Sequence, residues 1–172
     1  MIAVTRALVC AALLLAAVVL QVSLFDGISY DGVVPSLVLL IVVGAALTRG
    51  AEFAMTLGFL GGILLDLAPP ADHVAGRWAL ALVVAGYLAG RVRQDAGQSA
   101  LASVVTVAAT SFVATSLFAL SGLLLQDDSV SVGEALRVIP ISVGYDVLLT
   151  PFVLPLVMKL FQRLDDHQVA FS

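Results

Sequence analysis

Residues 58–93 constrain the fold most, because they form two apolar segments joined by a turn that a helix cannot cross. The turn contains Pro69 and Pro70, and two consecutive prolines remove two backbone N–H donors and end a helix. The apolar segments on either side suit a lipid environment. The sequence therefore predicts two membrane-spanning helices, residues 51–67 and 76–91, that turn back at the prolines.

Each helix of this pair carries two glycines four residues apart, a spacing that lets helix backbones approach closely within a membrane. They are Gly58 and Gly62 in the first helix, and Gly86 and Gly90 in the second. Trp78, near the start of the second helix, has an amphipathic ring that suits the lipid headgroup level. We interpret this pair as a packing core.

Composition extends this interpretation to the whole chain, in which apolar residues make up 61% of 172 residues and charged residues only 12%. Soluble domains are nearer half apolar and a quarter charged. We therefore expect an all-α, multi-pass protein of the cell membrane, folded as a single domain over residues 1–172. The expected helices are residues 4–25, 33–47, 51–67, 76–91, 99–125 and 135–161.

Two of these segments are irregular. Residues 33–47 are too short to cross a bilayer of about 30 Å and begin near Pro35, so this helix either thins the bilayer or leans on its neighbours. The last segment contains Pro140, Pro151 and Pro155, which predict a kinked helix. The polar tail after residue 161 is expected to fray.

The distribution of basic residues predicts that both termini lie in the cytoplasm, because loops on that side are enriched in Lys and Arg. This orientation places six of the eight inside, namely Arg6, Arg49, Arg91, Arg93, Lys159 and Arg163, and leaves Arg77 and Arg137 outside. The outer loops are then acidic, with Asp26, Asp31, Asp72, Asp127, Asp128 and Glu134.

Asp146 is the most informative single residue, because it lies nine positions after Arg137 and so about 13 Å along a helix. An ionisable group at that depth is costly and indicates a role. One interpretation is a buried polar contact that fixes the last helix, or a partner's helix, against Tyr87 or the hydroxyl groups of residues 99–125. The other is a protonated, hydrogen-bonded side chain beside the backbone loosened by Pro151.

Asp66 ends the first helix of the central pair, and it has two interpretations of its own. A carboxylate at a helix end costs little when water reaches it, so simple solvation is one. The other is an ion pair with Arg77 across the outer turn, which would hold the two helices together.

Several function classes have little support in the sequence. Nucleic-acid binding needs clustered basic residues, whereas this chain has a net charge of -4. Asp72 and His73 are too few for a metal site, and the membrane segments offer a seryl nucleophile no histidine base. We expect no enzymatic activity, no cofactor, no metal and no catalytic residue.

Five stretches carry a resemblance to the MreD family of rod shape-determining proteins, in its actinobacterial form. They are GFLGGILLDL at residues 58–67, PPADH at 69–73, GRWAL at 76–80, GYLAGR at 86–91, and the run 145–155 in the last helix. The resemblance implies a fold similar to the substrate-binding subunits of energy-coupling-factor transporters, although a shared fold does not establish transport.

The resemblance also implies a membrane subunit of the bacterial elongation machinery. Its partners would be MreC, which has one membrane span and a large outer domain, and through MreC the MreB filaments and the RodA glycosyltransferase with its penicillin-binding transpeptidase. Such a subunit regulates peptidoglycan synthesis and cell shape as a scaffold. The alternative is a solute-binding or transport subunit, with a cavity open to the outer face and Asp146 and Tyr87 as ligand contacts.

Overall fold

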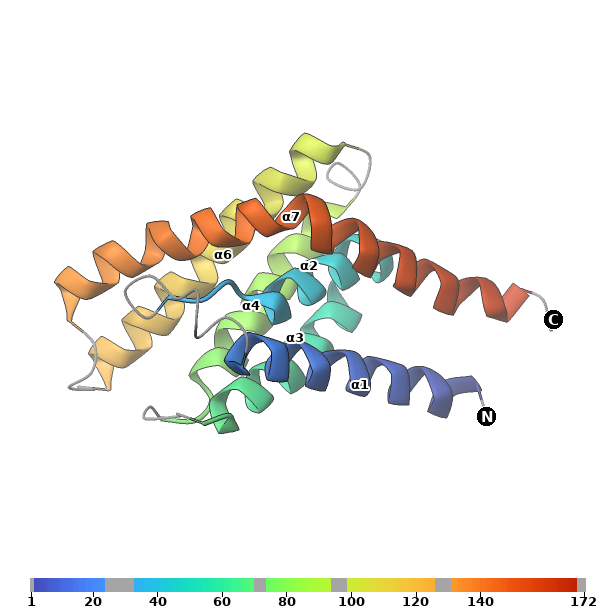
Figure 1. The fold of residues 1–172 in the computed structure, drawn as a ribbon, viewed down its shortest axis with the longest axis horizontal. Coiled ribbons are helices and arrows are strands. Elements are labelled where there is room, and N and C mark those ends of the chain that lie inside the picture. Colours follow the sequence, from blue (N-terminus) through green and yellow to red (C-terminus); the bar gives the residue numbers. More distant parts are fainter. Residues whose placement is uncertain (1, 24–32, 70–73, 94–98, 126–130, 170–172) are drawn as a thin grey trace.

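The computed structural model describes residues 2–23, 33–69, 74–93, 99–125 and 131–169, and its main elements are six α-helices (Figure 1). The helices are α1 (Ile2–Ser23), α2 (Leu37–Arg49), α3 (Ala51–Leu67), α4 (Arg77–Arg91), α6 (Ala100–Leu124) and α7 (Val132–Val169). The six segments expected from the sequence are therefore confirmed as helices.

Three of these helices are long and apolar enough to cross a membrane: α1 over Arg6–Ser23, α6 over Ala100–Leu124 and α7 over Val132–Leu164. They indicate a multi-pass membrane protein. Helices α2, α3 and α4 are shorter, with 13, 17 and 15 residues.

The shortest helix, α2, lies in the middle of the structure (Figure 1). Every residue from Val38 to Leu47 is buried, and α2 contacts each of the other five helices. A helix that is apolar on all sides needs such surroundings. The prediction that this segment leans on its neighbours is confirmed.

Helix α2 begins at Leu37, four residues later than expected, because Pro35 has no N–H and Ser36 acts as the N-cap. The Ser36 hydroxyl oxygen accepts a hydrogen bond from the Leu39 N–H at 3.3 Å. A local capping residue therefore contributes to the N-terminal boundary of α2.

Helix α7 is longer than expected at both ends. The hydroxyl oxygen of Ser131 accepts a hydrogen bond from the Glu134 N–H at 3.1 Å. Ser131 thus caps the helix, which begins at Val132 and not at residue 135. The helix also continues to Val169. The expectation of a frayed tail is therefore wrong for residues 162–169, which no glycine or proline interrupts, while residues 170–172 lie outside the described residues. Figure 1 shows α7 changing direction midway, as its internal prolines predict.

The predicted close packing occurs between α3 and α4 themselves. A Cβ added at Gly58 would lie 2.6 Å from the backbone oxygen of Leu82, and one at Gly62 would meet the backbone of Ala79. From the other side, a Cβ at Gly86 would lie 3.0 Å from the backbone oxygen of Ala54.

Gly90 completes this interface, because a Cβ there would meet the backbone of Ala51. The two antiparallel helices therefore touch along their full shared length through residues that have little or no side chain. The interpretation of the pair as a packing core is confirmed, and its glycine faces are occupied within the pair.

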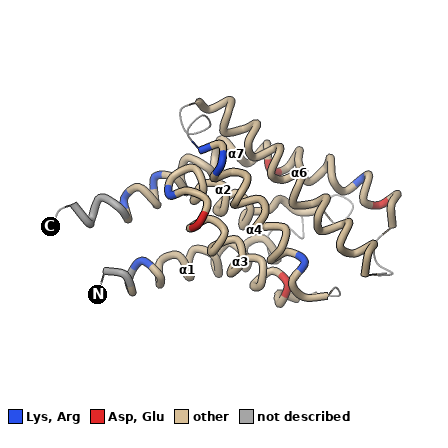
Figure 2. The backbone as a smooth tube through the Cα atoms, turned by 180° about the vertical axis from the view of Figure 1, so that it is seen from behind, with Lys and Arg blue, Asp and Glu red and all other residues tan. Residues whose placement is uncertain are grey.

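The basic residues gather at the end of the molecule where both termini lie (Figure 2). Two hydrogen bonds connect separate segments of the chain at this end. Arg49, at the end of α2, donates to the Phe161 carbonyl of α7 at 3.4 Å, and Arg93 donates to the Leu47 carbonyl at 3.2 Å. Arg77 and Arg137 lie near the starts of α4 and α7 instead. We call the end of the molecule where both termini lie the basic end.

A matched pair of glycine substitutions tests the α3–α4 interface. Gly62→Ala is expected to lower the free energy of unfolding by about 1–3 kcal/mol, because the backbone of α4 must move away. Gly144→Ala in α7, where an added Cβ meets nothing within 4 Å, should raise it by about 0.5–1 kcal/mol. Unfolding in sodium dodecyl sulfate, followed by Trp78 fluorescence, measures both. Equal effects at the two positions would contradict the close approach.

Candidate functional site

Asp146 lies inside the protein with 1% of its surface exposed and joins three helices. One carboxyl oxygen accepts a hydrogen bond from the Ser36 backbone N–H at 2.7 Å. The other accepts from the Ser111 hydroxyl of α6 at 2.6 Å. One side chain of α7 therefore connects the start of α2 to the middle of α6. We call Asp146, Ser36, Ser111 and Gln21 the buried polar centre.

This centre satisfies the start of α2, where the first N–H groups of any helix have no intrahelical acceptor. Besides the bonds from Ser36 and Leu39, the Val38 N–H donates to the Gln21 side-chain oxygen of α1 at 3.4 Å. Ser36 and Gln21 are both buried. An unsatisfied donor in apolar surroundings is costly, and a carboxyl oxygen also suits the positive end of a helix dipole.

Of the two contacts predicted for Asp146, one is confirmed. The hydroxyl partner in residues 99–125 is Ser111. Tyr87 lies elsewhere, with 43% of its surface exposed, and its hydroxyl group accepts from Arg91 at 3.5 Å. The described hydrogen bonds therefore do not join Asp146 and Tyr87.

Sequence reasoning missed Ser36 and Gln21. Ser36 had a recognisable signal, since a serine after a proline and before an apolar run is typical of an N-cap. Gln21 is an amide within an apolar helix, which marks a polar contact without naming its partner.

Asp66 is buried, with 3% of its surface exposed, so the interpretation as a solvated helix end is wrong. Its carboxyl oxygens accept from the backbone N–H groups of Gly76 at 2.8 Å, Trp78 at 3.1 Å and Ala79 at 3.2 Å. Gly76 is the N-cap of α4, with a positive φ of 101° and no side chain to cap with. Asp66 therefore supplies the capping oxygens from the end of α3.

Arg77 is buried and reaches across to α6. It donates to the Phe118 carbonyl at 2.9 Å and to the Ser121 hydroxyl at 3.3 Å, and its guanidinium carbon lies 4.0 Å from the centre of the Phe118 ring. Trp78 stacks on the same ring at 4.4 Å. These contacts attach the α3–α4 pair to α6, while an ion pair between Asp66 and Arg77 stays a prediction.

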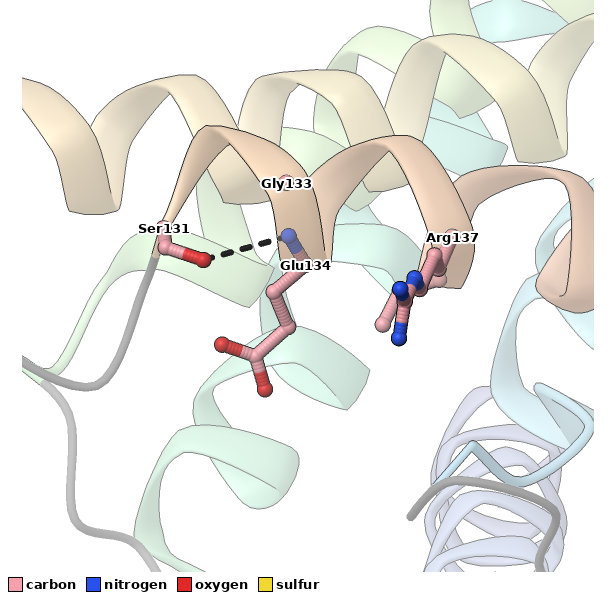
Figure 3. A pocket seen from close by; sticks show the side chains of 5 residues that line it. Ser131, Gly133, Glu134 and Arg137 are labelled. Carbon is pink, nitrogen blue, oxygen red and sulfur yellow. Dashed lines mark hydrogen bonds between the residues drawn. The ribbon is translucent and has the colours of Figure 1, made fainter.

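The start of α7 borders an open pocket of about 620 Å³. Glu134 and Arg137 extend from the same side of this helix, and Ser131 and Gly133 complete the first turn (Figure 3). Neither Asp146 nor Tyr87 is among the described residues that line it. This pocket therefore does not involve the two residues predicted as ligand contacts, and a solute cavity with Asp146 and Tyr87 stays a prediction.

The described residues contain no group of three or more His, Cys, Asp or Glu side chains that could hold a metal ion. Asp72 and His73, the pair considered in the sequence, lie outside the described residues. The same is true of the acidic loop residues Asp26, Asp31, Asp127 and Asp128.

No family model, curated protein or solved structure matches this chain.

Replacing Asp146 tests the buried polar centre. Asp146→Leu is expected to lower the free energy of unfolding by about 1–3 kcal/mol for each of the two donors that lose their acceptor. Asp146→Asn should cost less, because its amide oxygen can still accept from Ser36. Unfolding in sodium dodecyl sulfate measures both, with Glu134→Leu on the exposed first turn of α7 as the matched control. Wild-type stability of Asp146→Leu would show that the centre does not stabilise the fold.

Proposed function

We propose that this protein is a non-enzymatic membrane subunit of the bacterial cell-elongation complex, as its resemblance to the MreD family implies. In this proposal it binds MreC in the membrane and restricts the conformations that MreC offers to the RodA glycosyltransferase and its transpeptidase. MreB filaments are linked indirectly. Scaffolding of this kind needs a rigid helical body and apolar surfaces.

One observation carries the proposal: three of the five stretches that resemble the family, residues 58–67, 76–80 and 86–91, pack together in the α3–α4 pair. The glycines of residues 58–67 and 86–91 bring α3 and α4 together, and Asp66 in the first stretch caps the helix that contains the GRWAL stretch. Stretches that were identified separately by their resemblance to the family therefore contact one another in the structure. This is expected if the stretches define an inherited architecture.

The proposed surface for MreC is lipid-facing, because the glycine faces are already used within the α3–α4 pair. Large apolar side chains are exposed along α6 and α7, for example Phe112 at 55%, Phe152 at 74% and Leu156 at 72%. Membrane-spanning helices associate through packing on such surfaces. A single span such as that of MreC fits this requirement.

We further propose six spans with both termini in the cytoplasm. Basic residues gather at the basic end (Figure 2), which favours the cytoplasmic side for this end. The short helices α2, α3 and α4 can serve as spans because neighbours cover them or because the bilayer thins around them.

A crosslinking pull-down from native membranes tests the proposal. The tagged protein is crosslinked, solubilised in mild detergent and analysed by mass spectrometry, with a tagged membrane protein of similar size as the control. MreC and the RodA synthase should be enriched over this control. Recovery of a cytoplasmic ATPase pair in their place would favour the solute-transport alternative, and absence of MreC at normal expression would overturn the scaffold proposal.

A further inference from the structure

A groove at the basic end, which we call the α1–α3 groove, has a volume of about 590 Å³ and is lined by α1, α3 and the end of α2. Its lining includes Arg6 and Leu14 on α1, Arg49 at the end of α2, and Phe53 and Leu60 on α3. It belongs neither to the buried polar centre nor to the α3–α4 interface.

The groove is polar at one end and apolar at the other. Arg6 and Arg49 lie at the basic end, near the beginnings of α1 and α3. Leu14 is eight residues after Arg6 on α1, which is about 12 Å along the helix. Its side chain lies close to α3, since a Cβ added at Gly61 would lie 3.1 Å from it. The groove therefore runs from two guanidinium groups into a channel with apolar walls.

This gradient matches the chemistry of an anionic lipid. Guanidinium groups bind phosphate oxygens well because their N–H donors fit two oxygens at once. Basic pockets between membrane helices are typical sites for anionic headgroups. Glu52 is exposed in the first turn of α3 and is not among the described lining residues. Among the described residues, the two charged side chains that line the groove, Arg6 and Arg49, are therefore both positive.

Two aromatic rings contact the side chain of Arg49 at the polar end of the groove. Its guanidinium carbon lies 4.6 Å from the centre of the Phe53 ring and 5.4 Å from that of Phe161. Those contacts use the faces of the rings, and one Arg49 N–H group also donates to the Phe161 carbonyl at 3.4 Å. A guanidinium group has five N–H donors in all. The side chain is positioned before a ligand arrives, which lowers the entropy cost of binding.

We propose that the α1–α3 groove binds one anionic glycerophospholipid, with its phosphate between Arg6 and Arg49 and an acyl chain along the exposed Ala11 and Leu60. The lipid would come from the leaflet at the basic end. It would fill the space between α1 and α3 and so hold α1 against the body. This site goes beyond the proposed function and does not depend on MreC.

Native mass spectrometry of the purified full chain tests the site. The protein is equilibrated with equal amounts of phosphatidylglycerol and phosphatidylcholine, and the bound lipids are counted. The wild type should retain phosphatidylglycerol preferentially. Arg6→Gln and Arg49→Gln should each reduce this preference about fivefold, which corresponds to about 1 kcal/mol for each basic residue. Arg163→Gln, at an exposed position of the basic end, is the charge control and should change nothing.

A second pair of variants tests the apolar part without removing a charge. Ala11 lines the groove and is exposed, whereas Ala12 beside it is exposed and does not line it. Ala11→Phe should displace the lipid, and Ala12→Phe should leave it bound. Neither position belongs to the core, so both variants are expected to fold.

Four results would overturn the site. Equal retention of the two lipids, or equal losses in Arg163→Gln and Arg6→Gln, would show general adsorption to a basic surface. Equal effects of Ala11→Phe and Ala12→Phe would show a lipid on the outer surface of α1. If Ala11→Phe removes a co-purifying protein and leaves the lipid bound, the groove is a protein contact.

Discussion

The hydrogen bond from the Ser36 backbone to Asp146 determines where α2 can begin. Helix α2 contacts all the other described helices, and its first turn is buried where water is not available to satisfy its N–H groups. A carboxyl group from α7, a hydroxyl from its own N-cap and an amide from α1 provide the acceptors. Because two of these acceptors come from other helices, we expect α2 to start at Leu37 only when α1 and α7 are in place.

The same solution is used a second time, at the start of α4. There the N-cap is a glycine, and Asp66 from α3 accepts three backbone N–H groups. In both cases an acidic side chain caps a helix other than its own. The cost of placing a carboxyl group within the protein is thus offset by hydrogen bonds from backbone donors, which would be costly if left unsatisfied.

Periodicity and turn residues predicted the helices well, because long apolar runs and the Pro69–Pro70 break are local signals. The glycine spacing predicted close packing, and the structure identified α3 and α4 as each other's partners. Capping between helices was not predictable, since nothing in the sequence near Asp66 or Asp146 names a distant N–H donor. The extension of α7 to Val169 was missed because polar composition was interpreted as fraying, although no helix-breaking residue is present.

The most direct test of this account is amide hydrogen exchange at the two capped helix starts, in detergent micelles. In the wild type, the Ser36 and Ala79 amides should both exchange slowly. Asp146→Leu is predicted to accelerate exchange at Ser36 by about tenfold or more, while the Ala79 amide, capped by Asp66, keeps its protection. Unchanged exchange at Ser36 in Asp146→Leu would contradict the claim that this carboxyl group fixes the start of α2.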